Sequence, residues 1–257
     1  MASAVLRKNP QVMNIGLYQS AASLTALERW QDAVTQNITA SQVTGFKKRT
    51  VDFQGVAMGE ILSDTAKQQG LAGMLPKASY GVNFAAGETT PTQRAFDAAI
   101  QGDGFFQVQT ASGDRAYTRA GEFHVRSDRT LVTKDGSPVL TDGGTPITLQ
   151  ADGGEFAIAS DGVVSQGETQ LGRLGIVRFV DNAQLVPAGG GLFHAPAGVA
   201  VLPVEQPQVL QGHLEASNVT PLREMVALVQ IARAYEANQK ILTSRDQMLD
   251  RALQVLG

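Results

Sequence analysis

The residues that carry chemistry in most enzymes and metal sites are few in this chain and stand apart. His124, His194 and His213 are its only histidines, and none has a second ligand at the spacing of a zinc site. Histidines placed in this way are typical of strand surfaces and turns. The chain has no cysteine, which excludes disulfides, thiolate metal sites and a cysteine nucleophile. The sequence therefore predicts no metal ligand.

Asp-Gly pairs are the other candidates for a site, because calcium loops are rich in both residues. An EF-hand loop needs the pattern Asp-x-Asp-x-Asp-Gly, which does not occur here, so tight turns explain the pairs better. No nucleophile elbow, phosphate-binding loop or dinucleotide fingerprint occurs either. Two carboxylates that meet only in the fold, as glycoside hydrolysis requires, are left open by the sequence. We predict no catalytic residue, no cofactor and no enzymatic activity.

The charge balance gives no reason to expect nucleic acid as a partner. The chain has 257 residues, of which 43% are hydrophobic, and its formal net charge is -3. Lys47, Lys48 and Arg49 form the only tight basic triplet, which we interpret as a solvated turn. No apolar run approaches the roughly 20 residues that cross a bilayer, so we expect no membrane insertion. The first residues lack the pattern of a cleavable signal peptide.

The first element that could position a surface is a helix predicted over residues 14–45. Gly45 ends its pattern where a capping glycine is expected. The apolar stripe is thin, so this helix needs a partner to be stable. Apolar residues recur at steps of three and four, and so share one face, at Leu17, Ala21, Leu24, Leu27, Val34 and Ile38.

A second helix is predicted over residues 219–256, and its pattern is stronger. Pro221 suits a first helical turn, and Glu224 complements the positive end of the helix dipole. Asn238 and Arg245 are polar positions within the repeat, either because they set the register or because they lie at an exposed edge. The heptad repeat consists of Leu228, Ile231, Tyr235, Asn238, Leu242, Arg245, Leu249, Ala252 and Leu256.

Between the helices the chain changes to short β-type runs separated by turns. Asp135-Gly136 and Asp161-Gly162 are two of the Asp-Gly pairs that supply the positive φ angles of tight hairpins. No helix of normal length intervenes, which indicates an antiparallel all-β region. Because hairpin strands find their partners locally, we expect a fragment of about residues 92–212 to fold by itself. The predicted strands are 105–108, 116–118, 122–125, 130–133, 147–149, 155–158 and 174–180.

The expected fold class is α+β, with N- and C-terminal α-helices that form a coiled-coil-like helical stem and a central antiparallel all-β domain. Met13 is an alternative start of the protein, since the residues before it fit no element. The expected domains are an N-terminal extension at 1–13, an N-terminal helix at 14–45, an extended linker region at 46–95, a central β domain at 96–212 and a C-terminal helix at 213–257.

Three stretches of the sequence have the order and spacing of a known family. The first comprises GLYQSAAS at residues 16–23 and NITASQVTGFK at residues 37–47. The second comprises FDAAIQGDGFFQV at 96–108, AYTRAGEF at 116–123 and LVTKDG at 131–136. The third comprises GHLEASNV at 212–219, RAYEANQK at 233–240 and DQML at 246–249. Together they resemble the flagellar rod and hook family, the axial proteins of the basal body. The compact length resembles a rod protein of the FlgF or FlgG type rather than the hook protein.

The resemblance implies a structural subunit of the flagellar basal-body rod that polymerises through its terminal helices into the axial tube and transmits torque from motor to hook. It implies export through the flagellar type III apparatus without signal cleavage, and a place in the periplasmic rod. The implied partners are other copies of the chain and neighbouring rod and hook proteins. The proximal and distal rod positions stay open. The predicted polymerisation interface is Leu17, Leu24, Leu27, Val34, Asn37, Ile38, Leu228, Ile231, Tyr235, Asn238, Leu242, Arg245, Leu249 and Leu256.

The alternative function is a secreted all-β binding module, an adhesin or carbohydrate binder with helical oligomerisation termini. Such a module would need an exposed aromatic platform on its β region. Trp30 is the only tryptophan and belongs to the first predicted helix. The sequence therefore favours the rod subunit.

Overall fold

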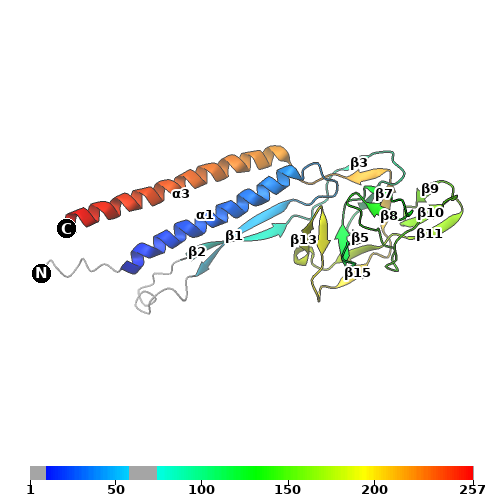
Figure 1. Cartoon of the computed structure of the whole chain (residues 1–257), viewed down its shortest axis with the longest axis horizontal. Helices are drawn as coiled ribbons and strands as arrows, with labels where there is room; N and C mark the ends of the chain where they lie inside the picture. The colour runs from blue at the N-terminus through cyan, green and yellow to red at the C-terminus, as the bar shows by residue number, and fades with distance from the viewer. Residues whose placement is uncertain (1–9, 58–73, 257) are drawn as a thin grey trace. The chain divides into compact units, whose positions relative to one another are not determined.

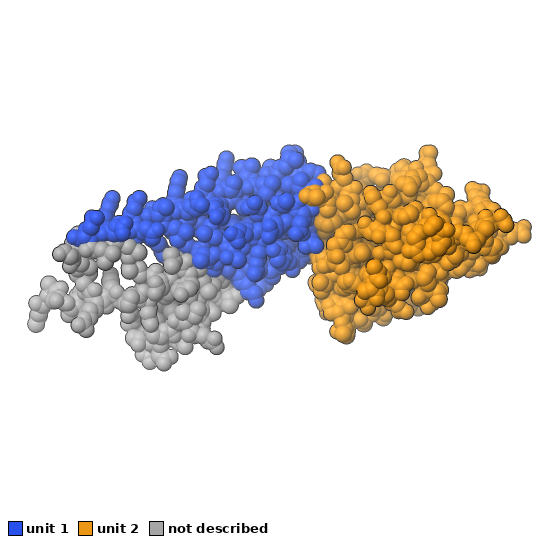
Figure 2. Space-filling model, in the orientation of Figure 1, with its two compact units in different colours: residues 1–38, 49–81, 221–257 blue, residues 39–48, 82–220 orange. Residues whose placement is uncertain are grey.

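The computed structural model describes residues 10–57 and 74–256, which divide into two compact units (Figure 2). Among these residues, unit 1 contains 10–38, 49–57, 74–81 and 221–256. Unit 2 contains 39–48 and 82–220. Both units therefore combine stretches that are far apart in the sequence. Most of the predicted extension at 1–13 lies outside the described residues.

The described part of unit 1 consists of two long helices and a two-stranded sheet (Figure 1). Helix α1 spans Pro10–Thr39 and helix α3 spans Pro221–Leu256. Strands β1 (Arg49–Ala57) and β2 (Met74–Val82) pair with each other. Both helices begin at a proline, whose fixed φ suits a first turn and whose missing N–H has no partner there anyway. No helix in the described part of the chain has both the length and the hydropathy of a membrane span.

Helix α1 is the middle layer of unit 1. One of its faces packs against α3, where Leu27 and Val34 of α1 and Ile231 of α3 form a buried cluster. A different face meets the β1–β2 sheet. There the Arg29 guanidinium donates a hydrogen bond of 2.8 Å to the carbonyl oxygen of Ala78. The stability of α1 therefore depends on partners on two sides, as its thin apolar stripe requires.

The expected coiled-coil-like stem is wrong. A coiled coil needs the heptad positions of two helices to interlock along their length. Among the described side chains, the buried core between α1 and α3 consists of only Leu27, Val34 and Ile231. Arg245, further along the predicted repeat, is exposed, and α1 also contacts the β1–β2 sheet. The fold is α+β, with one helix near each end of the chain and a large antiparallel β region between them in sequence.

Unit 2 is built from antiparallel sheets, of which the largest has six strands in the order β13-β14-β6-β5-β12-β15. A short 3-10 helix, η1 (Asn182–Gln184), precedes β13. The six strands are β5 (Phe105–Gln109), β6 (Arg115–Thr118), β12 (Ile176–Phe179), β13 (Val186–Gly189), β14 (Leu192–His194) and β15 (Val201–Pro203).

The smaller sheets of unit 2 include two that join the beginning of the unit to its end. Strand β4 pairs with β16, and β3 pairs with β17, across more than a hundred residues of sequence. The remaining sheets are β11-β10-β9 and the pair β7-β8. These strands are β3 (Thr89–Pro91), β4 (Ala98–Gln101), β7 (Phe123–Val125), β8 (Leu131–Thr133), β9 (Phe156–Ile158), β10 (Val163–Gln166), β11 (Thr169–Arg173), β16 (Gln208–Gln211) and β17 (His213–Glu215).

The core of unit 2 has two apolar clusters. The larger includes Phe106 and Phe123, whose rings meet edge to face with centroids 5.2 Å apart. The smaller is aromatic, with Phe105 in contact with the rings of Phe179 and Phe193. Each such ring buries a large apolar area, so a few aromatic residues suffice to hold the short strands together.

Candidate assembly surface

The described residues contain no cluster of metal ligands. No group of three His, Asp or Glu side chains gathers among them as a metal site would require. His124 is exposed on β7, and His194 and His213 are half-buried in separate strands. The Nδ1 atoms of the last two lie near backbone carbonyl oxygens of Arg115 and Gln211. A functional surface has to be sought among the apolar and buried polar groups instead.

On α1, the predicted interface residues lie mostly inside unit 1. Leu27, Val34 and Asn37 are buried there. Leu24 and Ile38 are half-buried. The side chain of Leu17 lies outside the described part of the structure.

On α3, the predicted interface residues change from buried to exposed along the helix. Ile231 is buried, Arg245 is exposed, and the side chains of Leu249 and Leu256 are outside the described part. Asn238 donates a hydrogen bond of 3.1 Å to the carbonyl oxygen of Ala234 in its own helix. The remaining four positions, Leu228, Tyr235, Asn238 and Leu242, are half-buried. The structure therefore brings part of the predicted set together within one subunit, and the polymerisation role of the whole set stays a prediction.

Asn37 joins three elements of unit 1. Its side-chain amide donates 2.9 Å to the carbonyl oxygen of Arg49 and 3.0 Å to a carboxylate oxygen of Glu224. Its side-chain oxygen accepts a hydrogen bond of 2.7 Å from the N–H of Arg49. The amide thus extends the backbone pairing at the start of β1 and reaches the first turn of α3 at the same time. Asn37 and Glu224 are both buried, which makes these bonds costly to lose.

The sequence analysis missed an apolar surface on α3. We call Leu222, Met225, Val226 and Val229 the α3 stripe. Their spacing of three and four residues places them on one face of the helix. Leu222 is 71% exposed and the other three are 52–53% exposed. The spacing was available as a signal, but the stronger heptad repeat on another face of the same helix obscured it.

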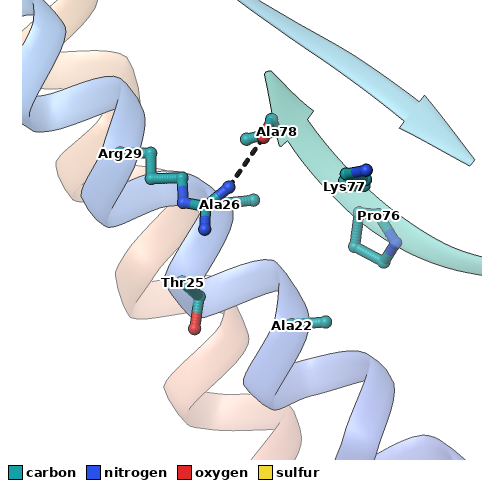
Figure 3. Close-up of a pocket in the computed structure, with 7 residues that line it drawn as sticks. All are labelled: Ala22, Thr25, Ala26, Arg29, Pro76, Lys77 and Ala78. Carbon is teal, nitrogen blue, oxygen red and sulfur yellow. Dashed lines mark hydrogen bonds between the residues drawn. The ribbon is translucent and has the colours of Figure 1, made fainter. Parts of the chain in front are cut away.

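A groove lies between α1 and β2 (Figure 3). Ala26 and Ala78 are buried at its floor, and Arg29 and Lys77 are exposed at its rim. Its volume is about 350 Å³, and most of its described lining is apolar. The figure shows the Arg29 side chain reaching across to the Ala78 carbonyl. The described residues that line it are Ala22, Thr25, Ala26, Arg29, Pro76, Lys77 and Ala78. We call it the α1–β2 groove.

Unit 2 contains a buried ionic network at Lys47, Glu215 and Arg119. The Lys47 ammonium lies 2.5 Å from one carboxylate oxygen of Glu215, and the Arg119 guanidinium lies 3.3 Å from the other. Lys47 also donates to the carbonyl oxygen of Ala85, and Arg119 to that of Gly102. Lys47 is therefore buried, and its interpretation as part of a solvated turn is wrong.

The protonation equilibria of this network follow from its burial. Burial lowers the pKa of the Lys47 ammonium, and the neighbouring Glu215 carboxylate opposes that shift. Burial likewise lowers the pKa of the Arg119 guanidinium, again against the attraction of Glu215. One carboxylate thus balances two cations away from water, with backbone carbonyls completing their hydrogen bonds.

Gly45 does not cap helix α1, although the sequence had predicted that it would. Helix α1 ends at Thr39, and Gly45 follows in a turn with φ of +68°. Its N–H donates a hydrogen bond of 2.7 Å to the carbonyl oxygen of Glu215. A Cβ atom added to Gly45 would overlap the backbone of Arg119 and Ala120. Glycine is therefore required because two backbones approach closely here.

Comparisons with known proteins cover nearly the whole chain. Residues 99–166 match the D1 domain of the flagellar hook protein FlgE/F/G, and residues 210–255 match the C-terminal family of the flagellar basal body rod FlgEFG proteins. The flagellar basal-body rod protein FlgF of Caulobacter vibrioides is 36% identical over 247 residues, which cover 95% of this chain and 99% of the relative. FlgF of Rhizobium meliloti is 32% identical, covering 95% of this chain and 99% of the relative. FlgG of Bacillus subtilis is 33% identical, covering 91% and 96%.

Proposed function

We propose, from the premise that this chain belongs to the family of flagellar basal-body rod proteins, that its copies associate with one another through the terminal helices of unit 1. Membership of the family makes the chain a structural subunit of the flagellar rod rather than an enzyme. It serves motility and assembles with other flagellar axial proteins. Nothing in the comparisons points to an adhesin, and the exposed large hydrophobic residues in the described part of unit 2 are valines, not aromatics.

The distribution of exposed apolar side chains supports assembly through unit 1. Among the described residues, twelve large hydrophobic side chains are exposed, and six of them lie on α3. They are Leu222, Met225, Val226, Val229, Ile241 and Met248. Soluble monomers rarely concentrate exposed apolar groups on one element, because doing so invites association. A subunit that ends in a polymer buries them against its neighbours.

We further propose that the subunit is exported by the flagellar type III apparatus and occupies the periplasmic part of the basal body. The absence of cysteine suits a chain that passes between redox compartments. In a tube, subunits related by a screw operation make heterologous contacts that do not close, and so build a filament. Repeated helix contacts of this kind would carry torque along the tube.

The interface is tested by placing charges on the predicted face of α3. We expect Leu242→Asp with Leu249→Asp to leave unit 2 folded and the chain exported, but to exclude it from isolated basal bodies and abolish motility. Two carboxylates on a face that must be desolvated cost several kcal/mol, about the contribution of several buried aliphatic side chains. The readouts are circular dichroism of the purified subunit, immunodetection in basal bodies and swimming on soft agar.

A matched control adds the same two charges to exposed polar positions of the same helix. Gln239 and Gln247 are both exposed, so Gln239→Asp with Gln247→Asp should assemble and swim normally. If the leucine variant assembles as well as this control, the predicted interface residues on α3 do not form the assembly face. If the unaltered chain is absent from basal bodies, the proposed location is wrong.

A further inference from the structure

Unit 1 carries two apolar surfaces that belong to different layers. One is the α3 stripe, and the other is the α1–β2 groove (Figure 3). The stripe is convex, since it is a row of exposed side chains on a helix. The groove is concave and lined largely by small residues, with Ala26 and Ala78 at its floor. The two surfaces therefore match in hydrophobicity and are opposite in shape.

The stripe faces away from the side of α3 that packs on α1. Successive residues of an α-helix are about 100° apart. Val229 of the stripe precedes the buried Ile231 by two residues, so the two side chains point about 200° apart around the helix axis. The stripe therefore cannot reach the groove of its own subunit while Ile231 stays packed against Leu27 and Val34.

The groove in turn lies on the side of α1 away from α3. Thr25 and Arg29, which line the groove, each stand two residues from Leu27, which contacts α3. Each is therefore about 200° from Leu27 around the axis of α1. Unit 1 thus presents its convex surface on one side and its concave surface on the other. Such an arrangement joins identical molecules head to tail and does not close on a pair.

We propose that the α3 stripe of one copy of this chain docks into the α1–β2 groove of the next copy. The inference rests on the proposed function, because it names the two surfaces that self-association uses. The groove volume of about 350 Å³ is more than twice the roughly 150 Å³ that holds one benzene ring in an apolar cavity, so two or more aliphatic side chains fit it. The exposed cations Arg29 and Lys77 stay at the rim, where they keep contact with water.

The contact is too small to hold two subunits together by itself. Stable protein pairs bury at least roughly 1,000 Å² in total, and four partly exposed side chains against one groove supply much less. The subunit therefore stays a monomer before assembly, and this contact forms where neighbouring rod subunits already hold two copies close together. The test accordingly belongs in isolated basal bodies.

The cysteine-free sequence allows a clean cross-linking test. Ala22→Cys with Val226→Cys places one thiol in the groove and one on the stripe of every subunit. A short bifunctional thiol reagent is used, because disulfides accept only a narrow geometry. In basal bodies from cells that make only this variant, we expect covalent dimers and a ladder of higher multimers. A second pair, Thr25→Cys with Val229→Cys, should give the same ladder.

Two controls separate this contact from other arrangements. Gln31 is exposed and lies at least about 120° around the axis of α1 from each groove residue of that helix, so Gln31→Cys with Val226→Cys should give no ladder. Val226→Cys alone should give no dimer. A dimer from that single variant would indicate two stripes packed face to face, and would overturn the proposal.

The remaining outcomes also decide the question. Absence of the ladder for both groove pairs overturns the proposal. Protection of Ala22→Cys from alkylation without a ladder means that another axial protein, or a segment of the same chain, fills the groove, and overturns it as well. If neither the unaltered chain nor any variant enters basal bodies, the proposed function itself fails, which is a different result from a subunit that assembles without the ladder.

Discussion

Lys47 and Glu215 show how much of unit 2 depends on single buried charges. Both side chains are almost fully removed from water, with exposures of 1% and 3%. Glu215 is the only carboxylate in the network and faces two cations, Lys47 and Arg119. Its loss would leave Lys47 without a paired carboxylate and Arg119 with only the electrostatic attraction of Asp103, whereas loss of Lys47 leaves Glu215 paired with Arg119. The two ends of the Lys47 ion pair are therefore not equivalent.

We predict that Glu215→Gln destabilises unit 2 more than Lys47→Met does. Removing one partner of a buried ion pair costs about 3–5 kcal/mol, and we expect Glu215→Gln near the upper end and Lys47→Met near the lower. Urea unfolding followed by circular dichroism measures both. Lys134→Met is the control, because Lys134 is 77% exposed and should change the free energy of unfolding by less than about 0.5 kcal/mol. A Lys47→Met variant as stable as the control would contradict the prediction.

A comparison of Gly45 with Gly113 separates the energetic cost of steric overlap from the cost of backbone strain. Gly45 and Gly113 both have positive φ, +68° and +90°, but a Cβ added to Gly113 meets no atom within 4 Å. We predict that Gly113→Ala costs about 1–2 kcal/mol, the strain of a left-handed residue with a side chain. Gly45→Ala should cost several kcal/mol more, because Arg119 and Ala120 would have to move. Thermal unfolding of the two variants compares them, and equal midpoints would show that the close approach is unimportant.

The role of Lys47 could not be predicted from the sequence. Three consecutive basic residues are usually solvated, and the partner of Lys47 stands 168 positions away. No local pattern reports a pairing over that distance. Asn37 was named from the sequence as an interface residue, and that role stays a prediction. The structure adds hydrogen bonds of Asn37 within unit 1, to Arg49 and Glu224, which no local pattern in the sequence reports.

At the scale of elements, the two terminal helices were predictable because each has a long apolar repeat, and Pro221 marked the first turn of α3. The first helix was expected to begin at residue 14, whereas α1 begins at Pro10. The strand before Asp161-Gly162 was also predicted, and Gly162 has the expected positive φ of +85°, but β10, which follows this turn and pairs with that strand, was not. The strands β3, β4, β16 and β17 were not. They are three or four residues long and pair across the full length of unit 2, so no neighbouring turn marks them.

The packing partners of the helices were less predictable than the helices themselves. The heptad repeat of α3 suggested one continuous contact with α1. Among the described side chains, the buried core of that contact is Leu27, Val34 and Ile231. Helix α1 also contacts the β1–β2 sheet through Arg29 and through Trp30, whose ring centroid is 5.8 Å from that of Phe53. A repeat in one sequence identifies an apolar face, but it does not identify what covers that face.

Asn37→Ala should loosen three elements at once. We predict a loss of about 2–4 kcal/mol, since the variant removes hydrogen bonds to both backbone groups of Arg49 and to the buried Glu224. The amide of Arg49 should also lose protection against hydrogen exchange. Gln36→Ala is the control, because Gln36 is exposed on the same turn of α1. Unchanged protection at Arg49 would show that Asn37 does not hold the start of β1.

At the scale of the whole molecule, each unit needs stretches from distant parts of the chain. Unit 2 takes residues 39–48 from before the β1–β2 sheet and ends at residue 220. Unit 1 is complete only with α3, the last element of the chain. Contacts of such long sequence separation form late, because the entropy of closing the intervening chain must be offset first. Neither unit is therefore finished before the C-terminal part of the chain is present.

Fragments of unit 2 test this dependence directly. The fragment 92–212, which hairpins alone suggested would fold, lacks β3, β17, Lys47 and Glu215. It leaves Arg119 without its carboxylate in a buried site, so we expect no cooperative unfolding transition. The fragment 82–220 restores β3, β17 and Glu215 and should unfold cooperatively. The fragment 39–220 adds Lys47 and Gly45 and should be the most stable of the three by urea unfolding.

We expect the fragment 39–220 to be more stable than 82–220 because of the contacts that residues 39–48 make, and not because the fragment is longer. Lys47→Met within 39–220 is the matched control, because it keeps every backbone contact of that segment and removes its buried charge. We expect this variant to lose about 3 kcal/mol and to approach the stability of 82–220, since Glu215 is then paired with Arg119 alone in both. If 92–212 unfolds cooperatively at the same urea concentration as 39–220, the local hairpins suffice. The network of Lys47, Glu215 and Arg119 would then not be needed for unit 2 to fold by itself.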